Sequence, residues 1–549
     1  MKRFWIMLFL LMGCLAVSFY PRASTQMKMQ GRERPVQLLA GLGNHHHPVK
    51  TSTPMAQRFF DQGLRLVYAF NHEEAIRSFR RAAELDPQMA MAYWGIGYAL
   101  GPNINLDIDP ERERLAYEAT QKALELSRGG PENERAYIEA LAKRYSIAPN
   151  ADLRRLAVEF KAAMGRLVLR YPDDLDAATI YAESAMNLRP WRLWSADGRP
   201  AEGTEEIIAV LESVLRRDPN HMGAIHYYIH AVEASPNPER ALVYAPKLPQ
   251  IAPAAGHLVH MPAHVYMRTG DYNAASRSNE AGAQADRNFF RLTGRQGMYP
   301  VMYYNHNLHF LAVAYSMEGR FQDALRAARQ LEANVAPSVK EMSMLEGFMA
   351  TSNLMLVRFR RWDEIMRLAQ PSPQLKAVTA TWHFARGMAL ASTGRETEAN
   401  EQLRLLRSTA EAVPKGVSFG LNSAESVLKV ADNVLAAKIA TAGGQARRAI
   451  ELLREAVRME DAFAYDEPPG WFLPVRESLG GALLLNRDYT EAERVFRADL
   501  ARNARSGRSL FGLRESLKAQ GKTYAAAMIQ AEFERAWRNA DTQLRIEDL

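Results

Sequence analysis

Residues 61–87 of this 549-residue chain read DQGLRLVYAFNHEEAIRSFRRAAELDP, and the fold can be inferred from them. Small residues stand at Gly63 and Ala75, an aromatic ring at Phe79, and Pro87 closes the stretch. Glycine and alanine let two antiparallel helices approach closely, and a phenylalanine on the second helix fills the space between them. Proline ends the second helix because it lacks a backbone N–H. The stretch therefore predicts a helical hairpin.

These offsets resemble those of the tetratricopeptide repeat, a unit of two helices that recurs every 34 residues. Degenerate copies follow, among them Gly270–Ala275, Gly319–Ala324 and Asn486–Ala492. No segment alternates apolar and polar residues over the length of a half-buried strand. The resemblance implies an all-α fold, a right-handed α-α superhelix (a tetratricopeptide-like solenoid) of roughly eight to ten helical hairpins.

The repeat pattern divides the chain into five segments. We expect a leader at 1–24, an extended polar arm at 25–54, N-terminal repeats at 55–220 with an insertion at 101–109, His-rich central repeats at 221–335, and C-terminal repeats at 336–549. The arm contains His46 and His47, and it could fold into the groove of the superhelix and add ligands there.

The leader has the layout of an export signal. Lys2 and Arg3 precede an apolar run that is short for a membrane span. Cys14 ends the sequence Leu-Met-Gly-Cys, which resembles the lipobox of bacterial lipoproteins. A cleaved secretory peptide, a lipoprotein leader and an uncleaved anchor are the three alternatives. All three predict an exported protein of the periplasm or cell envelope, with membrane contact only through an anchor or a lipid on Cys14.

Composition excludes several classes of function. The formal charge is +7, and without the basic leader residues Lys2, Arg3 and Arg22 it is +4, which is too weak and too dispersed to predict nucleic-acid binding. Because Cys14 is the only cysteine, the body has no disulfide, zinc–thiolate site or cysteine nucleophile.

Seven of the thirteen histidines lie between residues 226 and 309. They form groups spaced by three or four residues, so each group lies along one face of a helix. Phased from the glycine, aromatic and proline marks, three first helices begin at Met222, Gly256 and Asn305. The resemblance implies that positions 2, 5 and 9 of a first helix face the concave groove, and all seven histidines fall on these positions. His383 falls on a packing position instead.

We therefore predict a histidine-rich site for a transition metal or a small ligand. Neutral imidazoles suit copper, zinc or iron better than calcium or magnesium. The predicted ligands are His226, His230, His257, His260, His264, His306, His309 and Glu183. Trp94 and Tyr98 would line the same groove, and Glu183 or Glu233 could serve as an acid or base.

The motifs HYYIH (226–230), GHLVHMPAH (256–264) and YDEPPGW (465–471) resemble those of a subgroup of bacterial tetratricopeptide proteins. This resemblance supports the predicted fold and does not indicate an activity. An envelope solenoid with a metal or small-ligand site is the leading hypothesis. The alternatives are an adaptor that binds a peptide or protein partner without metal, and a metal-dependent oxidase or oxygenase. No complete catalytic motif, such as His-Glu-x-x-His, supports the enzyme.

Overall fold

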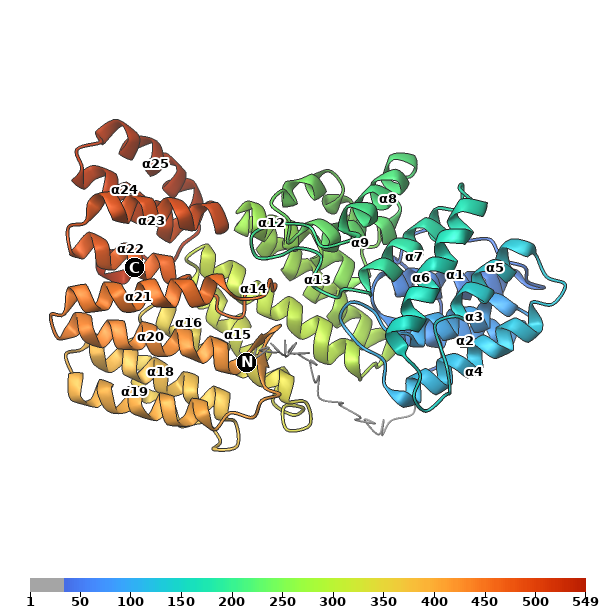
Figure 1. Ribbon diagram of the computed structural model, residues 1–549, viewed down its shortest axis with the longest axis horizontal. Helices are drawn as coiled ribbons and strands as arrows, with labels where there is room; N and C mark the ends of the chain where they lie inside the picture. Colours follow the sequence, from blue (N-terminus) through green and yellow to red (C-terminus); the bar gives the residue numbers. More distant parts are fainter. Residues whose placement is uncertain (1–33) are drawn as a thin grey trace, which may run out of the picture.

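The chain folds into an elongated superhelix of paired antiparallel helices (Figure 1). The computed structural model describes residues 34–549, so the predicted leader and the first residues of the predicted arm lie outside the described residues. The N-terminal helices occupy one end of the molecule and the C-terminal helices the other, with α9, α12, α13 and α14 between them. The predicted all-α tetratricopeptide-like superhelix is confirmed.

The N-terminal part consists of four helix pairs. They are α1 (Pro54–Tyr68) with α2 (His72–Leu85), α3 (Ala90–Leu100) with α4 (Pro110–Leu126), α5 (Glu132–Leu141) with α6 (Leu153–Arg170), and α7 (Leu175–Met186) with α8 (Thr204–Arg217). The predicted insertion, residues 101–109, is the loop between α3 and α4.

The central part mixes long and short helices. They are α9 (Met222–Val232), η1 (Pro238–Val243), η2 (Ala245–Lys247), α10 (Leu248–Ile251), α11 (Gly256–His260), α12 (Pro262–Thr269), α13 (Tyr272–Thr293), the π-helical turn η3 (Pro300–Tyr304), α14 (Asn305–Met317) and α15 (Phe321–Val335).

The C-terminal part continues the array and contains one small hairpin of strands. Its helices are η4 (Ser343–Ala350), α16 (Thr351–Arg358), α17 (Trp362–Arg367), α18 (Lys376–Ser392), α19 (Glu396–Glu411), α20 (Ala424–Ala442), α21 (Ala446–Asp461), α22 (Val475–Leu485), α23 (Tyr489–Arg502), α24 (Gly507–Ala519), α25 (Thr523–Ala536) and η5 (Ile546–Asp548). Strands β1 (Ser418–Phe419) and β2 (Asn422–Ser423) pair antiparallel, with Ser418 opposite Ser423.

The small residues of the first hairpin act as the sequence predicts. A Cβ atom on Gly63 would lie 2.6 Å from the Phe79 ring, and one on Gly95 of the next repeat would lie 2.4 Å from it. The Phe79 side chain is fully buried between these two helices. Side-chain caps define the helix starts, since Thr53 accepts from the backbone of α1 and Asn71 from that of α2.

The turns inside the hairpins require a left-handed backbone. Gly270 and Gly319 supply it after α12 and α14, with φ of 78° and 77°. Phe70 stands at the equivalent turn after α1 with a φ of 53°, which a bulky residue rarely adopts. Its ring is 2% exposed and packs against histidines of α9 and α11. We infer that packing of this ring compensates the backbone strain.

Three helices of the central part begin where the repeat phase predicts. Met222, Gly256 and Asn305 are the first residues of α9, α11 and α14. The repeat that starts at Gly256 departs from the pattern, because its first helix is divided into α11 and α12 at Pro262. Proline cannot donate the backbone hydrogen bond that a continuous helix needs there.

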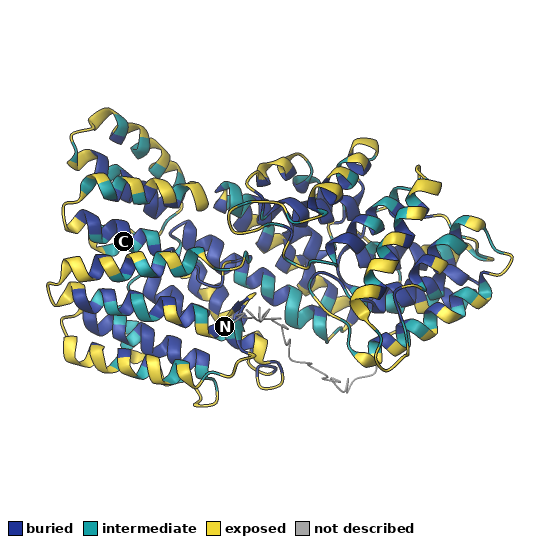
Figure 2. Ribbon diagram, in the orientation of Figure 1, coloured by how far each residue is buried: buried dark blue, intermediate teal, exposed yellow. Residues whose placement is uncertain are grey.

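Burial is deepest along the inner helices (Figure 2). One apolar core runs through the N-terminal part to Val265, and a second extends from Leu311 to Ala526. Within residues 34–549, we find no helix with the length and apolar character needed to cross a membrane. Residues 34–53 form no helix and lie against α1 and α7.

Candidate metal centre

The central helices bring the predicted histidines together inside the molecule. α9 carries His226 and His230, α11 carries His257 and His260, α12 carries His264, and α14 carries His306 and His309. The first five are at most 6% exposed, and the last two are half-buried. The sequence predicts an open groove at this point, whereas the structure encloses most of these imidazoles. Aromatic rings pack on them and cover them.

His226, His230 and His257 form a first triad. The Nε2 atom of His226 lies 3.1 Å from that of His230 and 3.0 Å from that of His257. One potential ligand atom of each residue lies within 4.8 Å of the others. The ring of Phe70 contacts all three imidazoles, at centroid distances of 4.4, 5.9 and 5.4 Å. The three nitrogens therefore converge in an apolar setting.

His260, His264 and His306 form a second triad of the same kind. The Nε2 atoms of His260 and His264 are 2.9 Å apart, and the His306 ring lies 5.1 Å from the His260 ring. Their potential ligand atoms also lie within 4.8 Å of one another. Phe310 contacts the three rings at 4.8, 4.6 and 5.0 Å. Each triad is thus packed against one phenylalanine.

The other ring nitrogen of each first-triad histidine on α9 faces an acceptor. Nδ1 of His226 lies 2.6 Å from the carbonyl oxygen of Tyr68, and Nδ1 of His230 lies 2.8 Å from a carboxylate oxygen of Glu233. A carbonyl or carboxylate oxygen can only accept, so both Nδ1 atoms carry the proton. In the neutral rings, both Nε2 atoms then present a lone pair.

The second triad is arranged in the same way. Nδ1 of His264 donates to the second oxygen of Glu233 at 2.5 Å, and Nδ1 of His260 donates to Asn279 Oδ1 at 2.6 Å. The orientation of the Asn279 amide is set, because its nitrogen donates to the Ala275 carbonyl at 2.8 Å. The Nε2 atoms of His260 and His264 therefore also face each other as lone pairs.

Glu233 connects the two triads. Its carboxylate is 1% exposed and accepts from one histidine of each. Burial alone would raise the pKa of this carboxyl, but the neighbouring His264 and His230 side chains lower it to about 2. The carboxylate therefore stays ionised and holds two imidazoles in the tautomer that exposes Nε2.

Protonation does not readily relieve the lone pairs that face each other in the His226–His230 and His260–His264 pairs. Burial, together with the neighbouring imidazoles, lowers the pKa of His226, His257, His260 and His306 well below the ordinary value. A cation that accepts lone pairs would satisfy each triad. With metal–nitrogen bonds of about 2.0–2.1 Å, two nitrogens of a tetrahedral ion lie about 3.3 Å apart. The observed separations of 2.9–3.1 Å are a few tenths shorter.

Not every predicted ligand joins a triad. The described groups of close ligand atoms include neither His309 nor Glu183. The His309 ring packs on Phe348 and Phe472, and burial lowers its pKa to about 4. Glu183 accepts hydrogen bonds from Tyr98 and Asn187.

The two aromatic residues predicted to line the groove lie beside Glu183. Trp94 and Tyr98 stack on each other at 5.2 Å and are each 3% exposed. The Trp94 ring also contacts Phe60 and Tyr137. These contacts are those of an aromatic core, and a role of this pair in ligand binding stays a prediction.

The sequence predicted Glu233 as an acid or base and missed its role as a bridge. Its place three residues after His230 on one helix was a usable signal. Asn279, Tyr68 and Phe70 come from other helices, and no spacing pattern links them to the histidines. His383, excluded by the repeat phase, bonds Gln402 at 2.8 Å and lies in no described ligand group.

A small cavity reaches the first triad from outside. Its volume of about 20 Å³ is enough for one water molecule. His230 and Glu233 line it, together with Trp191, Trp194 and Tyr465. Tyr465 belongs to the YDEPPGW motif, so the C-terminal part also contributes to the surroundings of the site.

Comparisons with known proteins identify no family for this chain. No protein-family model matches it, and no curated protein matches it. Solved structures with some similarity include a human IFIT1 dimer with m7Gppp-AAAA, at 13% identity and a TM-score of 0.34, over 89% of this chain and 91% of that one.

Two further solved structures show the same level of similarity. The P58(IPK) TPR domain has 13% identity and a TM-score of 0.22, over 85% of this chain and 99% of that one. The APC/C hetero-tetramer Cut9-Hcn1 has 12% identity and a TM-score of 0.32, over 90% of this chain and 75% of that one. Similarities this weak carry no functional argument, so the function is argued from the site itself.

Proposed function

We propose that this protein is a tetratricopeptide-like solenoid that binds two transition-metal ions in its interior, one in each histidine triad. One observation carries the proposal. In each triad two imidazoles donate through Nδ1 to fixed acceptors, which leaves their Nε2 lone pairs facing each other at 2.9–3.1 Å. Such an arrangement of buried neutral rings is costly without a cation between them.

The donor set selects among metals. Three neutral nitrogens suit copper, zinc or iron, whereas calcium and magnesium require oxygen ligands. The one carboxylate that joins the triads, Glu233, is occupied by two Nδ1–H groups. It therefore orients the two histidines by accepting hydrogen bonds from their non-ligating nitrogens, as carboxylates commonly do for metal-bound histidines.

Metal-dependent oxidation, the second alternative from the sequence, is compatible with a small reactant. Three protein ligands leave a further position on an ion for water or substrate. The cavity at His230 and Glu233 has room for a molecule about the size of water or dioxygen.

The adaptor alternative and the export prediction lead to separate tests. A peptide bound on an outer face of the solenoid would be retained after chelation, whereas a partner that depends on the metal sites would be released. Export is proposed from the apolar leader alone, and cell fractionation tests it.

The direct test is the metal content of untagged protein purified without chelator. We expect about two equivalents of one transition metal. Replacing His226 and His257 by alanine should remove one equivalent, and replacing His260 and His306 should remove the other. His383→Ala is the matched control, since that buried histidine lies outside the triads. Less than about a tenth of an equivalent, even after reconstitution with copper, zinc or iron, would contradict the proposal.

A further inference from the structure

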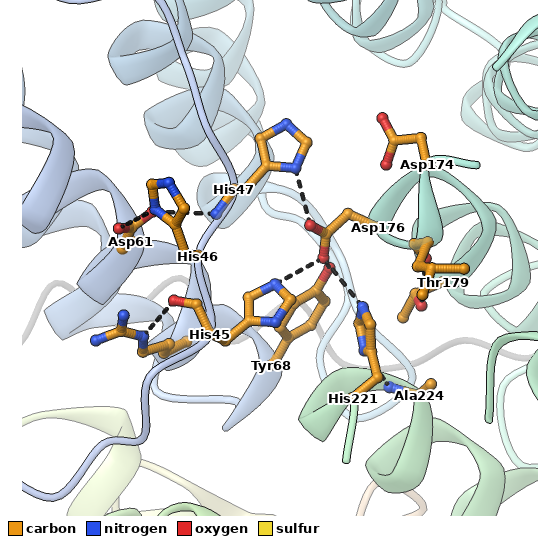
Figure 3. A network of polar contacts seen from close by, with 12 residues as sticks. His45, His46, His47, Asp61, Tyr68, Asp174, Asp176, Thr179, His221 and Ala224 are labelled. Carbon is orange, nitrogen blue, oxygen red and sulfur yellow. Dashed lines mark hydrogen bonds and ion pairs between the residues drawn. The ribbon is translucent and has the colours of Figure 1, made fainter. Parts of the chain in front are cut away.

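A second cluster of histidines surrounds a buried carboxylate on α7, as Figure 3 shows. Asp176 is 6% exposed. His45 Nε2 contacts one of its oxygens at 2.9 Å, and His47 Nδ1 contacts the other at 2.8 Å. The Tyr68 hydroxyl donates to the first oxygen as well, and His221 Nε2 lies 3.3 Å from it. His45 and His47 belong to residues 34–53, the part of the predicted arm that the structure describes before α1.

This cluster differs from the triads in the position of the protons. Nδ1 of His221 accepts from the backbone N–H of Ala224 at 3.1 Å, so the proton of the neutral ring is on Nε2 (Figure 3). Nε2 of His221 is therefore a donor that points to Asp176 and has no lone pair for an ion. The carboxylate is surrounded by hydrogen-bond donors. The contacts of His45, His47, Tyr68 and His221 with Asp176 are called the latch, because they hold the arm.

Tyr68 belongs to both the latch and the first triad. Its hydroxyl bonds Asp176, while its carbonyl oxygen accepts the Nδ1 proton of His226 at 2.6 Å. The ring is fully buried against α9, where a Cβ on Gly223 would lie 2.5 Å from Tyr68 Cδ1. A shift of Tyr68 would therefore move the acceptor that orients His226.

The arm also contacts the segment that leads into the other helix of this triad. The Gly41 carbonyl accepts from the backbone N–H of Ala254 at 2.9 Å. A Cβ on Gly41 would lie 3.0 Å from the Ala254 side chain. Ala254 stands two residues before the start of α11, which carries His257. Two contacts thus connect the arm to two different ligands of the first triad.

A cleft of about 630 Å³ lies beside the latch, bordered by residues 44–48 of the arm, residues 173–176 of α7 and its N-terminal turn, and His221. Water can therefore reach the bonds to Asp176. The arm also contributes apolar contacts, since Leu42 is 3% exposed within the N-terminal core and Leu39 and Val49 pack against that core, so its release exchanges polar contacts and also exposes apolar side chains.

We propose that docking of the arm and metal binding by the His226, His230 and His257 triad are coupled through Asp176 and Tyr68. The inference rests on the proposed metal-binding function. With the arm docked, Tyr68 is fixed and His226 presents Nε2 to the ion. Because coupling between two binding events is reciprocal, a metal in this triad strengthens arm docking by the same factor. Asp176 and Tyr68 are positioning residues in this scheme.

The test compares metal affinity in full-length variants. Copper(II) or zinc(II) is titrated into the metal-free protein. Replacing His45 and His47 by alanine should weaken the first-triad affinity at least about tenfold, the lower end of the effect typical for groups that orient metal ligands. The second-triad affinity should be unchanged. His46→Ala is the control, because His46 bonds Asp61 and its side chain is 55% exposed. Tyr68→Phe, which keeps the ring and the carbonyl, should also weaken the first-triad affinity, as in the His45/His47 double alanine variant (the latch variant).

A second measurement detects the coupling through the rate at which trypsin cleaves the arm. Lys50 is exposed, so trypsin can cleave there when the arm is released. Metal should slow this cleavage in the wild-type protein and in His46→Ala, and have less effect in the latch variant. The coupling would be overturned if the His45/His47 double alanine variant and Tyr68→Phe both bound metal at the first triad with wild-type affinity. A cleavage rate that does not depend on metal would overturn it as well. A wild-type protein that binds no ion would instead overturn the proposed function.

Discussion

Glu233 directly follows α9 and His264 lies on α12, yet a carboxylate oxygen of Glu233 is 2.5 Å from His264 Nδ1. The other oxygen bonds His230 on α9, the helix that ends directly before Glu233. One side chain thus determines the tautomer of a histidine in each triad. Loss of Glu233 would therefore affect both centres.

Glu233→Gln should therefore weaken both metal sites. A glutamine has one acceptor oxygen and an NH2 group, so it can accept from only one of the two Nδ1–H groups. The other histidine then loses its orienting partner. We expect affinity to fall about 10- to 100-fold at one site and less at the other, measured by titration of the metal-free protein. Glu212→Gln on α8, whose carboxylate bonds Tyr228 and Arg240, is the control. Equal affinities in Glu233→Gln and wild type would contradict this role.

Asn279→Leu should affect the second triad alone. The substitution leaves the buried Nδ1–H of His260 without an acceptor, at a cost of about 1–3 kcal/mol. The affinity of the second site should fall while that of the first is retained. Asn433→Leu is the control, because Asn433 also donates to the carbonyl four residues before it but is half-buried on α20, outside the triads. Loss of both ions in Asn279→Leu would show that the triads are not independent in this respect.

The sequence predicted the helices of the site better than its chemistry. Repeat marks located the first residues of α9, α11 and α14, because spacing along one helix is a local property. His257 and His264 are seven residues apart, or about 10 Å along an ideal helix, which favours their separation into two triads. The placement of His260 in the second triad, only three residues from His257, follows from tertiary packing. The acceptors that fix the tautomers were not predictable, because Tyr68 and Asn279 are brought there by tertiary packing.

His309→Leu distinguishes the sequence prediction from the structure. Repeat phase places His309 on a ligand position, but its ring packs between Phe348 and Phe472. Leucine keeps much of this apolar contact, so we expect both equivalents of metal to be retained. Glu183→Gln should retain them as well. Metal analysis of the two purified variants checks this, and loss of one equivalent in either would restore that residue to the ligand set.

Asp286→Asn should change how stability depends on pH. Asp286 is 1% exposed on α13 and accepts from the Tyr299 hydroxyl at 2.9 Å. Burial raises the pKa of its carboxyl from 3.8 to about 7. Between these two values the folded protein keeps a proton that the unfolded chain has released, so the free energy of unfolding falls as pH rises. The full change is about 4 kcal/mol for three pH units.

Asparagine has no such proton to lose, so the variant should gain stability relative to the wild type from pH 4 to pH 7 and stay level above it. Urea unfolding of the metal-free proteins at several pH values measures this difference. Asp173→Asn serves as the control, because the Asp173 side chain is 96% exposed and its substitution should leave the pH profile parallel to that of the wild type. A constant difference between wild type and Asp286→Asn would mean that the carboxyl is already ionised at pH 4. Asp286 lies against Gly256, where a Cβ would come within 2.0 Å of its Oδ1 atom, so its ionisation places a charge beside the first residue of the helix that carries His257 and His260.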